Sequence, residues 1–269
     1  MYTEVPWRLI RSLSRKKERD KSHLTVAEGP SVVLSALRAR VEMHAVILTR
    51  DFADSERSLA IREAMKQQPG TCRLFTVSMD LYTRMSGTRT PQGAMCLVTI
   101  PFRFLEGEPE AAWKEPLYVI GVDIQDPGNV GTLIRNGASA GASNIIFCGY
   151  SADPFSPKVI RASAGAIFRS RVSFREDPVN VLQECHQSRI SVYKAIPRGG
   201  IPPWEGNFRF PCAVVLGNEG QGLSPEVLAL TGLGITIPMP GGTESLNVAM
   251  ACSILLYEAV RQRMKAGDI

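Results

Sequence analysis

Short apolar segments alternate with helical patterns throughout the second half of the chain, and this alternation constrains the fold more than any other feature. The segments are residues 117–122, 144–149, 171–174, 191–196, 212–217 and 235–239. Most of them are apolar almost throughout, which is typical of strands in a parallel sheet that is covered on both faces. Helices are the usual connections between parallel strands. The pattern therefore predicts an α/β domain built on a parallel sheet.

The first half of the chain predicts a smaller α/β domain. Strands are expected at residues 24–29, 44–50, 72–78 and 95–100, and helices at 31–40 and 58–68. Residues 104–115 are polar, contain Gly and Pro, and lack the alternation of a strand. We therefore predict a first domain over residues 1–103, a linker over 104–115 and a second domain over 116–269.

Composition excludes several classes of protein. The chain is 44% hydrophobic and 21% charged, which is ordinary for a globular protein. No apolar run reaches the roughly 18 residues that span a bilayer, and the N-terminus lacks the apolar core of a signal peptide. We expect a cytoplasmic protein without membrane contact. The six cysteines form no C-x-x-C pair and the three histidines are isolated, so no metal site is predicted.

The positive charge of the chain is concentrated at its N-terminus. The net charge is +5, and residues 1–21 hold seven Lys and Arg against three acids. These cations are Arg8, Arg11, Arg15, Lys16, Lys17, Arg19 and Lys21. They are candidates for a polyanion-binding surface, because neutralised phosphates dominate affinity for nucleic acids. A solvated basic helix is the alternative.

Ligands of an open parallel sheet bind beyond the carboxyl ends of its strands, so the loops after the strands carry the candidate site. Residues 123–141 follow the first strand of the second domain, and we expect Asn129 to cap the helix there. Arg135 points away from the apolar face of this helix. It is a candidate functional residue, with an ordinary surface arginine as the alternative.

Two further strand ends carry unusual loops. Residues 216–228 hold three glycines in six residues around Glu219, which leaves amide groups free for a ligand. Ser224 is expected to cap the helix that follows. After residues 235–239 comes a Gly-rich turn and a long helix, with Ser245 and Asn247 at its start. Amides there suit a carboxylate, although plain capping is the alternative.

Residues 137–141, GASAG, formally match the G-x-S-x-G pattern of serine hydrolases with Ser139 as nucleophile. That pattern requires a strand before it and a helix after it. Here a predicted helix precedes the segment and a predicted strand follows it. We therefore interpret GASAG as the end of a helix, and a serine hydrolase is the weaker hypothesis.

Together the three loops resemble the three motifs of the SpoU/TrmH branch of the SPOUT RNA methyltransferases. The first motif is matched by Asp126, Pro127, Asn129, Gly131 and Arg135. The second is matched by Leu216, Gly217, Glu219, Gly222 and Leu223. The third is matched by Ile237, Pro238, Met239, Gly241, Ser245, Leu246 and Asn247. The sequence departs from the common family pattern at Asn136 and Ala140, where a threonine and an aromatic residue are frequent.

The first half is similar to the L30e-like substrate-binding domain that precedes many of these enzymes. The similarity covers residues 8–102 and rests on the segments SLSRKKERDKSHLTVAEGPSVVLSAL and MSGTRTPQGAMCLV. It implies ribosomal RNA, most simply 23S rRNA, as the substrate. A tRNA ribose methyltransferase and an inactive RNA-binding protein of the same fold remain as alternatives.

The resemblance also implies a fold, an activity and a set of site residues. The fold would be a SPOUT α/β-knot domain with a C-terminal trefoil knot, in a homodimer. S-adenosylmethionine would donate a methyl group to a ribose 2′-hydroxyl of structured RNA. Cofactor binding would involve Leu216, Gly217, Asn218, Glu219, Gly222, Ile237, Met239, Ser245 and Leu246. Catalysis would involve Asn129, Arg135, Glu219, Ser245 and Asn247. RNA would be bound by Arg135 and the N-terminal cations.

Overall fold

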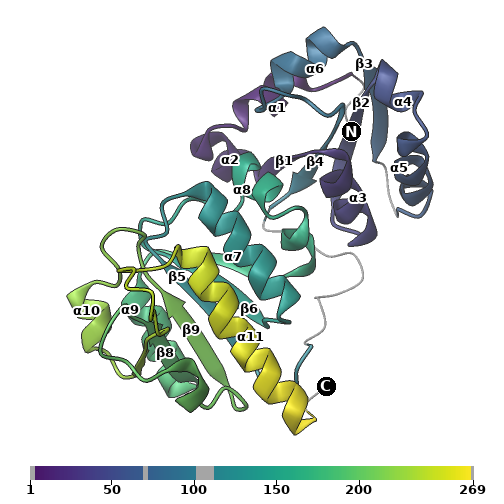
Figure 1. Ribbon diagram of the computed structural model, residues 1–269. Helices are drawn as coiled ribbons and strands as arrows, with labels where there is room; N and C mark the ends of the chain where they lie inside the picture. The colour runs from purple at the N-terminus through teal and green to yellow at the C-terminus, as the bar shows by residue number, and fades with distance from the viewer. Residues whose placement is uncertain (1–3, 69–71, 101–111, 268–269) are drawn as a thin grey trace. The chain divides into compact units, whose positions relative to one another are not determined.

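The computed structural model describes residues 4–68, 72–100 and 112–267, which fold into two units (Figure 1). The first unit is formed by Met1–Pro109 together with Phe155–Arg169, and the second by Glu110–Pro154 and Ser170–Ile269. Residues 104–111 of the predicted linker lie outside the described residues. Trp113 is buried in the second unit, where its indole N–H donates to the Ala140 carbonyl at 2.7 Å.

The first unit is built on a mixed four-stranded sheet. Its strands are β1 (Leu24–Glu28), β2 (Met43–Thr49), β3 (Arg73–Val77) and β4 (Ala94–Thr99). The sheet order is β1-β4-β2-β3, with β4 antiparallel to both of its neighbours and β2 parallel to β3. Each strand agrees with a predicted segment to within one residue at either end, because alternating or continuous apolar runs identify strands well.

Helices cover both faces of this sheet (Figure 1). They are α1 (Trp7–Ser12), α2 (Lys16–Ser22), α3 (Pro30–Arg38), α4 (Arg50–Ala53), α5 (Arg57–Lys66) and α6 (Met79–Met85). Side chains of α1 and α6 form an apolar core with inward-facing residues of the strands, among them Val26, Ile47 and Leu97. Helices α3 and α5 pack on the other face. The predicted helices at 31–40 and 58–68 correspond to α3 and α5.

One segment of the first unit comes from the middle of the second half of the chain. It holds α8 (Pro157–Ala162) and the short 3-10 helix η1 (Ala166–Arg169). The hydroxyl of Thr25 on β1 donates to the Phe155 carbonyl at 2.8 Å. The predicted second domain was continuous over 116–269, whereas the structure groups these fifteen or so residues with the first unit.

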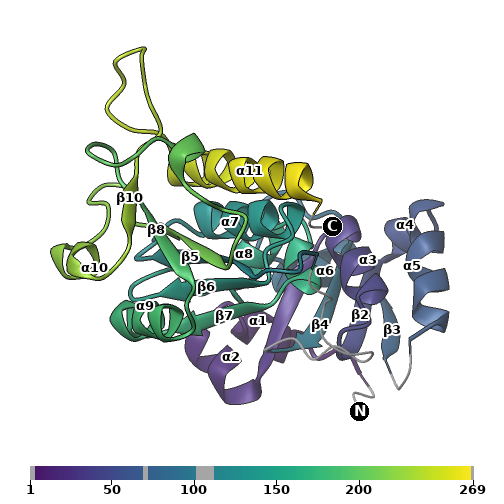
Figure 2. The ribbon, with the colours of Figure 1, turned by 90° about the horizontal axis from the view of Figure 1, so that it is seen from below.

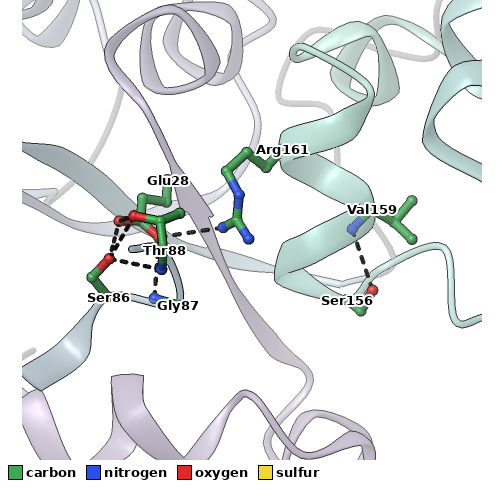
Figure 3. Close-up of polar contacts among 7 residues, drawn as sticks. All are labelled: Glu28, Ser86, Gly87, Thr88, Ser156, Val159 and Arg161. Carbon is green, nitrogen blue, oxygen red and sulfur yellow. Dashed lines mark hydrogen bonds and ion pairs between the residues drawn. The ribbon is translucent and has the colours of Figure 1, made fainter. Parts of the chain in front are cut away.

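A buried carboxylate at the end of β1 anchors this segment (Figure 3). The side chain of Glu28 is 4% exposed, and its Oε2 lies 3.3 Å from Nη1 of Arg161 on α8. Glu28 also accepts hydrogen bonds from the Ser86 hydroxyl, from the Gly87 amide at 3.3 Å and from the Thr88 hydroxyl at 3.3 Å. A buried charge of this kind is stable only with such partners.

Replacing Glu28 by alanine is expected to lower the free energy of unfolding by about 2 kcal/mol. The change leaves the half-buried Arg161 guanidinium and two hydroxyls without their acceptor, and each loss of this kind is costly. Denaturant titration followed by circular dichroism measures the effect. The exposed pair of Arg84 and Asp80 on α6 provides the control, since Asp80→Ala should cost less than about 0.5 kcal/mol. Equal losses of unfolding free energy in the two variants would contradict the role of Glu28 in holding α8 against β1.

The second unit is built on a six-stranded, fully parallel sheet, as the sequence predicts. Its strands are β5 (Leu117–Val122), β6 (Asn144–Cys148), β7 (Val172–Arg175), β8 (Ser191–Ala195), β9 (Cys212–Leu216) and β10 (Leu233–Ile235). The order is β10-β8-β9-β5-β6-β7. The predicted last strand at 235–239 is wrong over most of its length. β10 ends at Ile235, ahead of Pro238 and Pro240, which lack the N–H that a ladder requires.

Helices lie on both faces of this sheet. Figure 2 shows α7 (Pro127–Ser139) and α11 (Val248–Ala266) on one side and α9 (Pro178–Gln187) on the other. Val227 of α10 (Pro225–Ala229) joins the core on the α9 side, together with residues such as Val181 and Val215. The remaining element is the 3-10 helix η2 (Pro203–Glu205). Within the described residues, no helix combines the length and apolar character needed to cross a bilayer.

Candidate active site

The loop after β5 begins with a capped helix. Asp126, and not Asn129 as predicted from the sequence, is the N-cap of α7, and its carboxylate accepts a hydrogen bond from the Asn129 amide at 2.9 Å. The aspartate precedes a proline at the first helical position, which is the usual start of a helix. Asn129 therefore lies inside the first turn, and its side chain is available for contacts with other loops.

Glu219 joins the loop after β9 to the loop after β5. Its Oε1 accepts from the Asp126 amide at 3.2 Å and from Nδ2 of Asn129 at 3.0 Å, and its Oε2 accepts from the Gln125 amide at 3.3 Å. An ionised carboxylate can accept several hydrogen bonds but donates none. The three donors are therefore arranged for the charged form of Glu219.

The same arrangement sets the charge of Glu219. Burial by itself would raise the pKa of this carboxyl, but the hydrogen bond from Asn129 and those from the amides of Glu219, Asp126 and Gln125 outweigh it. The net result is a pKa below the usual value of a glutamate. Glu219 thus remains an anion near neutral pH and acts as an acceptor that holds loop geometry.

Asn247 brings the third loop into the same network. It is the N-cap of α11, where its Oδ1 accepts from the amides of Ala249 at 2.9 Å and Met250 at 3.3 Å. Its Nδ2 then donates to Oδ1 of Asn129 at 3.1 Å. The two side-chain hydrogen bonds thus run in one direction, from Asn247 to Asn129 and from Asn129 to Glu219. The three loops that the sequence singled out therefore meet at the carboxyl edge of the sheet.

Two asparagines hold the surrounding backbone. Nδ2 of Asn218 donates to the Asp123 carbonyl at 2.9 Å, and its Oδ1 accepts from the amides of Gly220 at 2.9 Å and Gln221 at 3.0 Å. Nδ2 of Asn136 on α7 donates to the Ala249 carbonyl at 2.8 Å, so it ties α7 to the first turn of α11. The departure from the family pattern at position 136 is thus a helix-to-helix contact here.

Glycine is required at two points of the loop after β9. A Cβ on Gly217 would lie 2.4 Å from the carbonyl carbon of Gly222, because the two backbone segments cross there. Gly222 itself has φ +71°, in the left-handed region that favours glycine. The Asn218 and Gly222 amides and carbonyls exchange two hydrogen bonds of 3.0 Å, which close this loop.

A cavity of about 490 Å³ lies beside this network. All nine predicted cofactor residues line it: Leu216, Gly217, Asn218, Glu219, Gly222, Ile237, Met239, Ser245 and Leu246. The lining also includes Ala195, Ile196, Pro197 and Arg198, which the sequence analysis missed. The available signal was the position of these residues at the carboxyl end of β8, followed by two glycines.

The structure does not bring every predicted site residue into the cavity. Asn129 and Asn247 lie in the polar network and outside the cavity lining. Arg135 is exposed on α7 and has no hydrogen-bond or ion-pair partner among the described residues. Ser139 is the last residue of α7, with β6 following, so the interpretation of GASAG as a helix end is confirmed.

The N-terminal cations differ in their exposure. Arg8 and Arg11 on α1 are exposed, as are Arg15, Lys16, Lys17 and Lys21 at α2. Arg19 is 3% exposed, and its guanidinium donates to the carbonyls of Leu13 at 2.7 Å and Ser14 at 3.0 Å. Arg19 therefore supports the turn between α1 and α2, and the prediction that it binds RNA is corrected on this ground.

Two family models match the chain. The SpoU rRNA Methylase family model covers residues 116–257. The MRM3-like substrate binding domain model covers residues 8–96. The first model includes all three loops of the polar network and the whole cavity lining.

Individual relatives agree with these matches over nearly the full chain. An uncharacterised tRNA/rRNA methyltransferase of Synechocystis is 31% identical, with 96% of this chain and 91% of the relative covered. The 23S rRNA (guanosine(2553)-2′-O)-methyltransferase RlmP of Bacillus subtilis is 29% identical, with 92% of each chain covered. The crystal structure of an AdoMet-bound rRNA methyltransferase from Sinorhizobium meliloti is 26% identical in sequence, with a TM-score of 0.78. The match covers 97% of this chain and 96% of the Sinorhizobium chain.

Proposed function

The chain belongs to the SpoU rRNA methylase family, and on this premise we propose that it transfers a methyl group from S-adenosylmethionine to a ribose 2′-hydroxyl of ribosomal RNA. The observation that carries the proposal is the convergence of three loops through Glu219, Asn129 and Asn247 beside a cavity of about 490 Å³. The second unit performs the transfer, and the first unit binds the substrate.

The cavity fits the cofactor in size and character. Its volume lies within the range of about 300–1,000 Å³ that is usual for small-molecule sites. Apolar side chains such as Leu216, Ile196 and Ile237 form its walls, and the closed glycine loop lets a ligand approach the backbone. S-adenosylmethionine, when bound there, supplies a methyl group on a positively charged sulfur. The nine lining residues predicted from the sequence hold the cofactor.

The polar network positions the reacting groups. Glu219 fixes the start of α7 relative to the glycine loop, and Asn247 fixes the start of α11. Well-positioned groups supply a large part of the acceleration in a displacement of this kind. Ser245, at the cavity wall, shapes the pocket for the cofactor and the ribose.

Arg135 acts on the RNA. Its exposed guanidinium binds the target ribose or its phosphate, orients the 2′-hydroxyl and stabilises the negative charge that develops on its oxygen. Arginine remains protonated in proteins, so it does not accept the proton itself. The proton of the 2′-hydroxyl passes to the neighbouring RNA phosphate as the oxygen bonds to the methyl carbon and the carbon–sulfur bond of the donor breaks. Arg8, Arg11, Arg15, Lys16, Lys17 and Lys21 add a basic surface that binds RNA phosphates.

Ribosomal RNA is the favoured substrate. RlmP and the mitochondrial rRNA methyltransferase 3 of Xenopus laevis, each matched over 92% of this chain, are named as rRNA methyltransferases, whereas the Synechocystis relative is named for tRNA and rRNA together. The test is incubation of the protein with tritiated S-adenosylmethionine and either rRNA or tRNA, followed by mapping of 2′-O-methyl positions. Label in rRNA only is the expected result. Label in tRNA would favour the alternative substrate, and the absence of both label and cofactor binding would refute the proposal.

The protein functions as a homodimer through α11, with the site near the subunit interface. The N-terminal half of this helix exposes Met250, Ile254 and Tyr257 at a spacing that places them on one face. Exposed apolar stripes of this kind mark contacts with a partner, and an isologous contact with a second copy is the commonest solution. The trefoil knot implied by the resemblance stays a prediction.

We expect the double change Ile254→Glu and Tyr257→Glu to convert the protein to a monomer. Two carboxylates on the stripe would be desolvated without partners in a dimer. Size-exclusion chromatography with light scattering measures the mass. Leu59→Glu, at an equally exposed apolar residue of α5, is the control and should leave the mass unchanged. A wild-type monomer, or a dimer that survives the double change, would contradict this interface.

A cytoplasmic location is part of the same proposal. All six cysteines are free thiols, and five of them are buried. Free thiols of this kind are typical of proteins in a reducing compartment.

A further inference from the structure

A second cavity of about 520 Å³ lies in the second unit, between η2 and the C-terminal half of α11. None of its lining residues is shared with the cavity described above. Its main side chains are one aromatic ring, two amides and three cations: Trp204, Asn207, Gln262, Arg209, Arg261 and Lys265. The composition is that of a site for a ligand with both a flat apolar surface and negative charge.

Trp204 is the aromatic wall of this cavity. The residue is 61% exposed, although tryptophan is usually buried for most of its surface. The segment that carries it is held in place by Gln262 on α11. Nε2 of Gln262 donates to the Gly206 carbonyl at 2.9 Å, and its Oε1 accepts from the Phe208 amide at 2.9 Å. The exposed indole is therefore presented on a fixed piece of backbone.

Arg263 strengthens the same attachment from the buried side of α11. It is fully buried, and its guanidinium donates to the carbonyls of Phe208 at 2.8 Å and Phe210 at 3.2 Å. Together with Gln262 it fixes residues 206–210 against the helix. A preformed wall lowers the entropy that a ligand must lose on binding.

The three cations around Trp204 are only partly neutralised. Arg261 forms a bidentate ion pair with Glu258, with distances of 2.8 and 2.7 Å. Arg209 lies 5.8 Å from the centre of the Phe210 ring and donates to the Asn207 side chain, which carries no charge. Lys265 is exposed and has no acidic partner among the described residues. Two positive charges therefore line the cavity without an acidic partner in the part of the chain that the structure describes.

We propose that this cavity binds an unpaired nucleotide of the RNA substrate, with its base stacked on Trp204 and its phosphate held by Arg209 and Lys265. Aromatic stacking combined with cations is how proteins hold single-stranded nucleic acid without reading its sequence. An acidic peptide would use the cations but would leave the indole without a partner of matching shape. The identity of the ligand as RNA rests on the proposed function. The position of the site rests on the cavity and its lining residues, and it does not depend on that function.

The first test uses the intact protein and a single-stranded decamer of uridine as the probe. Binding is expected to quench the fluorescence of Trp204, since this ring is more exposed than the half-buried Trp7 and the buried Trp113. The Trp204→Phe variant separates its signal from that of Trp7, which lies beside Arg8. Trp204→Ala should weaken the affinity about tenfold, measured by filter binding. Trp204→Phe keeps a stacking ring, so it should retain most of the affinity while the part of the quenching that comes from Trp204 disappears.

The second test measures the dependence of this affinity on salt. Arg209→Gln and Lys265→Gln should each lower the slope of log K against log salt by about 0.7, the value for one phosphate contact on a single strand. Arg189→Gln is the control, since this exposed arginine follows α9 on the other face of the sheet. Leu233→Ala is a second control for the loss of an exposed apolar side chain.

Three results would overturn the proposal. The first is an unchanged affinity of the Trp204→Ala variant for the decamer. The second is displacement of the decamer by polyglutamate of equal charge at equal concentration, which would indicate an acidic protein partner. The third is a decrease in tryptophan fluorescence as the protein concentration rises in the absence of RNA, which would indicate that a second copy of the chain occupies the cavity. Failure of the wild-type protein to methylate rRNA would refute the proposed function alone, because the decamer measurements do not involve transfer.

Discussion

Replacing Arg135 by alanine is expected to lower the rate of methyl transfer by about 10²–10³-fold, the usual loss for one donor that stabilises a developing oxyanion. The affinity for S-adenosylmethionine should remain within about twofold of the wild type, because Arg135 does not line the cavity of about 490 Å³ and has no partner among the described residues. Single-turnover transfer of a tritiated methyl group to rRNA measures the rate. Isothermal titration measures the cofactor affinity.

Two further variants make this experiment specific. Arg135→Lys keeps the charge but loses the planar, two-pronged donor, so it should recover only part of the rate. Ser139→Ala changes a residue one turn further along the same helix. It should transfer methyl groups at the wild-type rate, and an inactive Ser139→Ala variant would mean that any change on this helix, and not the loss of the Arg135 guanidinium, stops transfer. Labelling of Ser139 by a fluorophosphonate probe would instead support the hydrolase hypothesis. A loss of cofactor binding in Arg135→Ala would mean that the proposed role of this residue is wrong.

Replacing Glu219 by glutamine is expected to weaken both cofactor binding and methyl transfer, by about 10-fold or more for each. The carboxylate accepts from the Gln125 and Asp126 amides and from Asn129, whereas a glutamine has one oxygen and an NH₂ group. One of the two backbone amides would therefore face the NH₂ group of the glutamine, which is also a donor. An amide left without an acceptor in this way costs roughly 1–3 kcal/mol. Isothermal titration and single-turnover transfer measure the two effects.

The pH dependence provides an independent measurement of the same interaction. The pKa of Glu219 in the folded protein is lowered from 4.5, so the hydrogen bonds of its carboxylate contribute fully above pH 4.5. The contribution is lost as the pH falls through the lower, folded value. The affinity of the wild type for the cofactor should therefore decline as Glu219 becomes protonated below pH 4.5. Glu219→Gln has no group to protonate there, so its affinity should not show this decline. A pH profile that is the same in the two proteins would contradict this assignment.

Glu226→Gln is the matched control for both measurements. Glu226 lies seven positions further along, exposed in the first turn of α10, and is outside the network and the cavity lining. The same chemical change there should leave cofactor affinity and transfer unchanged. Comparable losses in the two variants would mean that the charge of the loop region, and not the hydrogen bonds of Glu219, determines the effect.

Much of the secondary structure could be predicted because it depends on local patterns. The parallel strands β5, β6 and β9 were identified from continuous apolar runs, which reflect burial on both faces of the sheet. Ser224 was identified as a helix cap from its neighbours Pro225 and Glu226, and it accepts from the Val227 amide in the structure. Where two local signals compete, the prediction failed. Asp126 and Asn129 both suit a cap, and only the backbone shows that the helix begins at Pro127.

The burial of Arg19 and the grouping of residues 155–169 with the first unit were not indicated by the sequence, for a different reason. A charge in a basic run gives no sign that it will be buried, and Arg19 is buried because two backbone carbonyls lie within reach of its guanidinium. The salt bridge of Glu28 and Arg161 joins residues 133 positions apart. No pattern in the chain indicates such a pair, since its geometry depends on how β1 and α8 pack.

The sequence by itself determined which residues form strands, which loops carry glycine and polar side chains, and which family the chain resembles, because local patterns and short motifs express these features. Only the tertiary structure decided that Glu219 accepts from Asn129 and that Asn129 accepts from Asn247. Those contacts depend on the sheet order, which places β9 beside β5 although their paired residues, such as Leu117 and Cys212, are far apart in the sequence. Hydrogen bonds form only when donor and acceptor lie within about 3.5 Å of each other, and such proximity between distant segments is a property of the folded chain alone.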